Sequence, residues 1–362
     1  MEIRILDINE IEARETEWEK LLLSMKTPSP FCSLDLILPW MRHFKDEYSP
    51  QCVGFFEGDA AKGFMPLAIS NRSLVEGRVL TFCGSTELYS DYLDIVSAEG
   101  DSARCLSALW DFLSGEGLSW DLIDLSLISK ESGLMSQITG SSPLEWELKE
   151  KSTAPFIDLT QGFEGFLSGF NGKHRYTLRK KVNKLAEQGF SFNTCAEELI
   201  PEGIESLFKL HALRATSKGI ESTFCGDKLL AFHKDAARRL SSSGRLWLRF
   251  LEKEDKRIGA FYGFELGGKL FYYQFGIDPE WEPFSPGTVL MYKVIEEAFT
   301  KGLTEFDFLR GNESYKYGWT KAERPLFEAR AYRRSLRGNL SKTVSHSRDF
   351  LKKRLKRLAG QE

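Results

Sequence analysis

Residues 271–316 read FYYQFGIDPEWEPFSPGTVLMYKVIEEAFTKGLTEFDFLRGNESYK. The aromatic run Phe271 to Ile277 is typical of a strand. From Thr288 to Lys301 apolar residues recur at helical spacing, and Gly302 then ends the pattern. Strand-like alternation returns from Thr304 to Leu309. The stretch therefore predicts a strand, a helix and a second strand, which is the repeating unit of mixed α/β folds.

The predicted helix begins at Ser285, Pro286, Gly287 and Thr288. Serine is a good N-cap, proline suits the first helical position, and glycine lets another molecule approach the backbone closely. Because the first amides of a helix lack partners within the helix, such a start binds anions, and we expect a pyrophosphate there. An ordinary capped helix explains the same four residues.

A polar cluster follows the second predicted strand, with Asp307, Glu313, Tyr315 and Lys316 within ten residues. Ligands of open α/β sheets bind beyond the carboxyl ends of the strands. We therefore expect this cluster to lie close to the anion site.

The length of 362 residues favours two domains, and a hydrophobic content of 42% is ample for packed cores. The balance of 49 basic and 52 acidic residues gives no general attraction to nucleic acid. Six well-separated cysteines and five scattered histidines predict no metal site and a reducing compartment. With no apolar run of about 18 residues and no signal peptide evident, we expect a cytoplasmic protein.

The two halves share an order of elements. A helix near Ser102 to Leu113 is followed by Gly117-Leu118-Ser119, and the helix ending at Lys301 is followed by Gly302-Leu303-Thr304. This favours two copies of one mixed α/β module, although three matched residues also arise by chance. A charged stretch, Lys149 to Pro155, marks the predicted boundary.

Several motifs together resemble the CelD-like acetyltransferases of the GNAT superfamily, which are related to the Fem-type aminoacyltransferases. The likeness extends over roughly residues 30 to 330. It is carried by Ser90-Asp91-Tyr92, the basic helix His174 to Lys181, Phe261 to Gly263, Tyr272-Tyr273, Gly276, Asp278, Ser285-Pro286-Gly287, Phe306 to Leu309, Gly311, Tyr315-Lys316 and Trp319.

The resemblance implies an α/β (α+β) fold of two tandem GNAT-like mixed-sheet modules with flanking helices. Residues 1–152 form an N-terminal module on the acceptor side, and residues 153–335 form the acyl-CoA module. Residues 336–362 form a basic amphipathic helix. The implied activity is transfer of an acyl group, acetyl first among them, from coenzyme A to a nitrogen or oxygen of a sugar or cell-envelope polysaccharide precursor.

The resemblance implies that the coenzyme A pyrophosphate lies on Ser285 to Thr288. It also implies that Lys316 stabilises the oxygen of the tetrahedral intermediate. A donor aimed at a developing oxyanion contributes on the order of 3 kcal/mol. Tyr315 and Asp307 supply further acid and base groups, but Asp307 is equally a carboxylate held by its strand, and Glu313 is more simply a solvated loop acid.

Three more residues are candidate acceptor contacts. Asp91 orients the acceptor between the modules in one reading and caps a turn in the other. Arg175 and Arg179 stand four residues apart on one shoulder of a helix, where they can reach an anionic ligand or simply pair with acids.

The last part of the chain is basic, with ten Lys or Arg and one acid, Asp349, from Arg333 to Arg357. Leu340, Val344, Leu351, Leu355 and Leu358 recur there at helix-like spacing. Such a helix rests on an anionic membrane face or packs its apolar stripe on the protein.

Two alternative functions remain. A Fem-type transferase would use aminoacyl-tRNA, but the coiled-coil insertion of that family has no room between Arg245 and Asp278. A catalytically inactive copy would act as a scaffold in polysaccharide synthesis.

Overall fold

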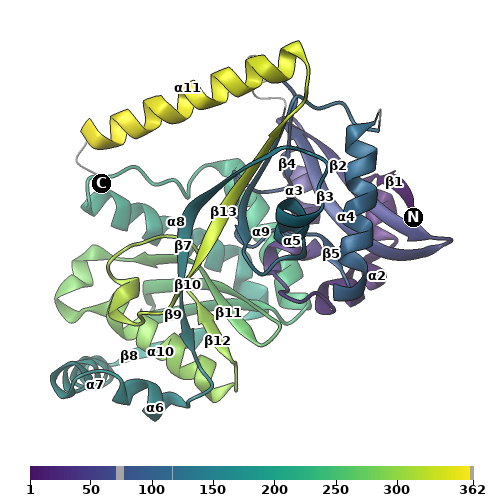
Figure 1. The fold of residues 1–362 in the computed structure, drawn as a ribbon. Coiled ribbons are helices and arrows are strands. Elements are labelled where there is room, and N and C mark those ends of the chain that lie inside the picture. The colour runs from purple at the N-terminus through teal and green to yellow at the C-terminus, as the bar shows by residue number, and fades with distance from the viewer. Residues whose placement is uncertain (71–76, 116, 359–362) are drawn as a thin grey trace. The chain divides into compact units, whose positions relative to one another are not determined.

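The computed structural model describes residues 1–70, 77–115 and 117–358 (Figure 1). The chain divides into two compact units. Unit 1 comprises Met1–Ser152 and Pro325–Glu362, and unit 2 comprises Thr153–Arg324. Strands β7 (Trp146–Asp158) and β13 (Glu323–Tyr332) carry the chain from one unit to the other.

In unit 1 the strands follow the order β1, β2, β3, β4, β6, β13, and β5 pairs with β3. Neighbours are antiparallel except β4 and β6, which are parallel. The strands other than β13 are β1 (Glu2–Leu6), β2 (Tyr48–Glu57), β3 (Ala60–Ser70), β4 (Val79–Phe82), β5 (Val96–Ser97) and β6 (Leu122–Ser129). The helices are α1 (Ile8–Glu12), α2 (Glu15–Leu23), η1 (Pro30–Cys32), α3 (Leu34–His43), α4 (Glu99–Ser114), α5 (Gly133–Gly140) and α11 (Leu336–Leu358).

Helices cover both faces of the unit 1 sheet. A Cβ on Gly63 of β3 would lie 3.2 Å from the Sγ atom of Cys105, so this glycine lets α4 approach closely. The next residue, Phe64, points to the other face and stacks on Trp18 of α2 with ring centroids 4.6 Å apart. Helices α2 and α4 therefore lie on opposite faces.

In unit 2 the strands follow the order β7, β12, β11, β10, β9, β8, and only β11 and β12 are parallel. The strands other than β7 are β8 (Phe190–Thr194), β9 (Leu246–Lys253), β10 (Lys256–Leu266), β11 (Lys269–Ile277) and β12 (Glu305–Asp307). The helices are α6 (Phe163–Ser168), α7 (Gly172–Glu187), η2 (Glu197–Leu199), α8 (Ile200–Ser217), α9 (Asp227–Ser242), η3 (Pro279–Phe284), α10 (Pro286–Thr300) and η4 (Lys316–Gly318).

Two glycines again show how helices cover the unit 2 sheet. A Cβ on Gly259 would lie 3.1 Å from Leu290 of α10, and one on Gly276 would lie 2.7 Å from Leu210 of α8. Gly259 pairs with Ile277, and the adjacent pair, Ala260 and Gly276, points to the other face. Helices α10 and α8 therefore cover opposite faces, and full burial of Leu290 contributes about 1.5–3 kcal/mol.

The predicted fold class is confirmed, since each unit carries a mixed sheet with a helix that connects two parallel strands. In unit 1 the short strand β5 and helix α4 connect β4 to β6, and in unit 2 the turn η3 and helix α10 connect β11 to β12. The predicted repeat of helix, Gly-Leu step and strand corresponds to these two connections.

The chain divides between Ser152 and Thr153, within the predicted boundary stretch Lys149 to Pro155, which is itself part of strand β7. The end of the second module differs from the prediction. Residues 325–335, expected in the second module, belong to unit 1, because β13 pairs with β6 from Leu326 to Tyr332. The predicted helix over 336–362 is observed as α11, and residues 359–362 lie outside the described residues.

Candidate active site

The parallel strands β11 and β12 stay paired for only three residues each. Lys269, Leu270 and Phe271 pair with Glu305, Phe306 and Asp307. Beyond this point the next residues, Tyr272 and Phe308, are separated by 6.0 Å between ring centroids at an interplanar angle of 86°. The strands part at their carboxyl ends, where a ligand of an open sheet binds.

Helix α10 begins at this end of the strands, directly after the 3-10 turn η3. Its N-cap, Ser285, has a left-handed backbone conformation with φ 55°, and its side chain makes no capping hydrogen bond. The expected side-chain cap is therefore wrong. Ser285 is also the C-cap of the turn η3, and its left-handed conformation changes the chain direction between η3 and α10.

Fewer main-chain donors are free at this helix start than the sequence predicts. The amides of Thr288 and Val289 donate to the Ser285 carbonyl at 3.1 and 3.2 Å, and Pro286 has no N–H. Among the described residues the Gly287 amide has no partner. The first turn of α10 carries no acidic residue, so the helix dipole there favours an anion.

Two tyrosines meet where the strands part. The Tyr315 hydroxyl donates to the Tyr272 hydroxyl at 3.2 Å. Burial raises the pKa of Tyr272 to about 12, against the opposing effects of the Tyr315 hydrogen bond and the charge of Arg214. Burial and then Tyr272 raise the pKa of Tyr315 well above its usual range. Both phenols therefore keep their protons at neutral pH.

Tyr315 combines a buried hydroxyl with an accessible ring. Its side chain is 37% exposed, although its hydroxyl lies against the buried Tyr272. It is thus the one member of the predicted catalytic trio, Lys316, Tyr315 and Asp307, that reaches the surface of unit 2.

Lys316 is buried and its ammonium group is engaged. Its Nζ atom donates to the carbonyls of Leu309 at 3.4 Å and Arg310 at 2.6 Å, and it pairs with Glu313 at 2.9 Å. Three N–H groups thus have three acceptors. In this structure Lys316 holds the loop 309–316 in place.

Asp307 is also a buried support of the same loop. One oxygen accepts the Leu309 amide at 2.7 Å, and the other lies 3.9 Å from the Arg324 guanidinium. Leu309 itself has φ 56°, a costly conformation for a leucine that the Asp307 contact helps to maintain.

The candidate acceptor contacts are engaged or buried within their own units. Arg175 donates to the carbonyls of Ser168 and Phe170, and Arg179 pairs with Glu164 at 2.7 Å. Asp91 is fully buried within unit 1, so it has no exposed surface with which to meet an acceptor.

Sequence reasoning missed Arg214, a half-buried residue of α8 whose charge acts on both tyrosines. Its guanidinium carbon lies 5.9 Å from the centroid of the Phe275 ring on β11. No local motif marks this arginine, because it reaches the site only through the packing of α8 on β11.

Residues 172–317 match the family described as acetyltransferase (GNAT) domain. This segment begins at α7 and contains both β11 and β12, the start of α10 and the tyrosine pair. The comparison with curated proteins finds no match.

Solved structures share the fold over most of the chain. FemX has a TM-score of 0.65 at 10% identity, with 91% of this chain and 97% of that chain covered. The C-terminal domain of a putative lysylphosphatidylglycerol synthetase from Agrobacterium fabrum has a TM-score of 0.57 at 12% identity, covering 92% and 95%. L-PGS from Bacillus licheniformis has a TM-score of 0.56 at 13% identity, covering 90% and 94%.

The domain match confirms the predicted class of enzyme, an acyltransferase of the GNAT type, with its domain in residues 172–317. Within the described part of the chain, no helix combines the length and the apolar character needed to cross a bilayer.

Proposed function

We propose that the protein is an acyl-CoA-dependent N- or O-acyltransferase whose reaction takes place in unit 2. The observation that carries the proposal is the parting of β11 and β12 beside the acid-free start of α10, within the segment that matches the acetyltransferase domain. Acetyl-CoA is the donor we favour, and a sugar or a cell-envelope polysaccharide precursor is the acceptor class.

The donor's diphosphate would lie at Ser285 to Thr288. The Gly287 amide supplies one main-chain donor, and the positive end of the α10 dipole attracts the charge. A Cβ on Gly287 would meet Phe275 and Ile277 only at ordinary distances of 3.6 and 3.7 Å, so packing alone does not require glycine there. Close approach of a ligand is a reason for glycine at this position.

The reaction joins the acceptor's nitrogen or oxygen to the thioester carbonyl carbon and breaks the carbon–sulfur bond. Coenzyme A leaves as a thiolate, and the proton lost by the acceptor balances it, so that the products are the acylated acceptor and the thiol of coenzyme A. Tyr315 is a neutral phenol with an accessible ring, and when its hydroxyl proton turns away from Tyr272 it would donate a hydrogen bond to the carbonyl oxygen or to the leaving sulfur. Lys316 and Asp307 act as positioning residues, because both hold the loop that carries Tyr315.

A second candidate is transfer from aminoacyl-tRNA. The fold is similar to those of FemX and a putative lysylphosphatidylglycerol synthetase domain, and this similarity is the reason to test an aminoacyl donor. Against it, the region from β9 to β11 consists of three strands joined by two tight turns, with no inserted helical arm.

Isothermal titration of the full chain separates the two donors. We expect acetyl-CoA to bind, and a mixture of charged tRNAs to give no heat beyond dilution. Binding of charged tRNA without binding of acetyl-CoA would contradict the acyl-CoA proposal and indicate an aminoacyl donor. Intact-mass analysis of envelope sugars incubated with the protein and acetyl-CoA then identifies the acceptor by a gain of one acetyl group.

A further inference from the structure

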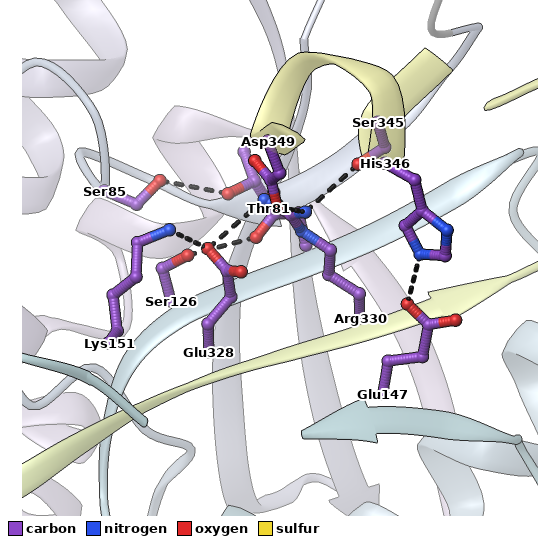
Figure 2. Close-up of polar contacts among 11 residues, drawn as sticks. Thr81, Ser85, Ser126, Glu147, Lys151, Glu328, Arg330, Ser345, His346 and Asp349 are labelled. Atoms are coloured by element: carbon purple, nitrogen blue, oxygen red, sulfur yellow. Dashed lines mark hydrogen bonds and ion pairs between the residues drawn. The ribbon is translucent and has the colours of Figure 1, made fainter. Parts of the chain in front are cut away.

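Helix α11 is attached to unit 1 by its polar face. Ser345 accepts a hydrogen bond from Arg330 at 3.1 Å, and Asp349 pairs with the same guanidinium at 2.8 Å (Figure 2). Ser341, four residues before Ser345, is 1% exposed. These three residues recur every four positions and therefore lie on one side of the helix.

Arg330 sits in a buried cluster whose charges are satisfied. Its guanidinium also lies 3.2 Å from Asp124 of β6 and 3.2 Å from Glu328, and Lys151 pairs with Glu328. The side chains of Arg330 and Glu328 are only 7% and 5% exposed. Breaking such a pair leaves an uncompensated buried charge, so the cluster fixes which side of α11 faces the sheet.

The opposite side of α11 exposes four apolar side chains, with Thr343 and Ser347 also exposed between them. Leu336 is 90% exposed, Leu340 54%, Phe350 66% and Leu351 57%. At about 100° per residue these four side chains lie within one stripe, away from Ser341, Ser345 and Asp349. The expected alternative, an apolar stripe packed on the protein, is wrong for Leu340 and Leu351, and the side chains of Leu355 and Leu358 lie outside the described residues.

The helix is also strongly basic. From Leu336 to Leu358 the sequence has eight Lys or Arg and one acid, Asp349, and that acid is used by Arg330. Arg337 and Arg354 are exposed near the two ends of the apolar stripe. A second copy of this helix is a poor partner, since it would bring two basic segments together.

We propose that the outer face of α11, formed by Leu336, Leu340, Phe350 and Leu351, docks on an anionic phospholipid surface. Apolar side chains enter the boundary between headgroups and acyl chains, and the surrounding Lys and Arg residues are attracted by anionic headgroups. Lys342 pairs with Glu147, whereas Arg337 and Arg354 are exposed and place positive charge near both ends of this face. The proposal does not depend on the activity of unit 2.

Vesicle flotation of the full chain tests this proposal. One set of vesicles is phosphatidylcholine alone, and the other contains about 30% phosphatidylglycerol. We expect binding to the anionic vesicles only, and a marked loss of binding when the salt concentration is raised. Equal binding to neutral vesicles, or none to anionic ones, overturns the proposal.

A matched pair of variants locates the contact. The double variant Leu340→Ser/Leu351→Ser should bind anionic vesicles at least about 10-fold more weakly, because two apolar side chains no longer enter the bilayer. The control Leu23→Ser/Leu199→Ser removes leucines that are 56% and 45% exposed elsewhere and should change binding by less than about twofold.

Three results contradict the assignment to α11. The first two are equal loss in both double variants and no loss in either. The third is a dimer in sedimentation velocity that dissociates in Leu340→Ser/Leu351→Ser, which would assign the face to a second copy. Circular dichroism and the melting temperature verify that each variant is folded.

Discussion

The two units contain the same connection but differ in what lies where its strands part. In unit 1, β4 and β6 pair in parallel through Val79–Leu122 and Leu80–Ile123, much as β11 and β12 do. Beyond that pairing, the Tyr92 amide donates to the Leu127 carbonyl of β6 at 3.0 Å. The protein's own main chain therefore occupies this end of the unit 1 strands, whereas unit 2 has a pair of tyrosine side chains there.

The starts of the two connecting helices differ in charge as well. The first turn of α4 contains Glu99 and Asp101, and that of α10 contains no acid. Acids at a helix start satisfy the dipole internally and repel an incoming anion. In the proposed function the donor binds in unit 2 and not in unit 1, and two features distinguish the units: the charge at the start of the connecting helix and the groups that lie where the strands part.

The substitution Thr288→Asp gives α10 the charge of α4 and should have the largest effect. We expect the affinity for acetyl-CoA to fall about 100-fold, because a carboxylate then competes with the diphosphate at the helix start. The fold should be unaffected or slightly more stable, by about 0.3–1 kcal/mol. Isothermal titration and thermal melts measure the two quantities.

The matched control is Thr300→Asp, the same change at the exposed far end of the same helix. It should leave acetyl-CoA affinity within about twofold, since charge effects at helix ends fade within one turn. If both variants bind acetyl-CoA as the unaltered protein does, the α10 start is not the donor site and the contrast with α4 has no functional meaning.

Tyr315→Phe removes the phenol that distinguishes the unit 2 opening. We expect the rate of coenzyme A release from acetyl-CoA to fall about 30-fold with little change in KM, because the lost hydrogen bond acts on the reacting atoms. Tyr317→Phe is the control, since Tyr317 bonds to Glu323, outside the tyrosine pair. An equal loss in both variants would indicate loop damage and would remove Tyr315 from the mechanism.

The segment from β11 through α10 to β12 could be predicted from sequence because its signals are local. The apolar periodicity of α10 and the aromatic run of β11 lie within single elements. Strands β7 and β13 carry no such signal. Charged residues such as Lys149 and Lys151 interrupt the pattern of β7, and β13 is a strand because it pairs with β6, about 200 residues away.

The sequence marks the polar residues of the candidate site but not their contacts. Tyr315, Lys316 and Asp307 are recognisable from their position after a strand. Lys316 binds two carbonyls and Glu313 because of the path of the loop 309–316. Arg214 acts on the tyrosines because α8 packs on β11. Ser285 has the composition of an N-cap, yet the preceding turn η3 decides its backbone conformation.

Acid should destabilise unit 2 through His233. This residue is fully buried among aromatic rings, and burial lowers its pKa to about 3. Below about pH 6.5 the imidazole of His233 binds a proton in the unfolded chain but not in the folded chain, so the free energy of unfolding decreases as the pH drops. Between pH 7 and pH 5 the free energy of unfolding decreases by about 2 kcal/mol.

Hydrogen exchange of the β10 and β11 amides at several pH values measures this effect in unit 2 alone. In His233→Phe the difference in opening free energy between pH 7 and pH 5 should be smaller by about 2 kcal/mol for these amides, and unchanged for the unit 1 amides. An unchanged slope in β10 and β11 would show that His233 is protonated in the folded state.

Unit 1 should respond in the opposite direction, and less strongly, through Asp94. Burial raises the pKa of this carboxyl to about 6, although the amides of Ile95, Leu134 and Gly133 donate to it and oppose the shift. The folded state then holds a proton that the unfolded state releases between pH 3.8 and 6, so stability rises as the pH falls through this window. From pH 7 to pH 5 the gain is about 1 kcal/mol.

The amides of α5 report this change by hydrogen exchange, and Asp94→Asn should remove the gain. The variant loses some stability at every pH, because an amide nitrogen replaces one acceptor oxygen at the start of α5. The pH slope is therefore the informative quantity. A slope retained in Asp94→Asn would assign it to another buried acid, of which Asp124 is the first candidate, since burial raises the pKa of that carboxyl too.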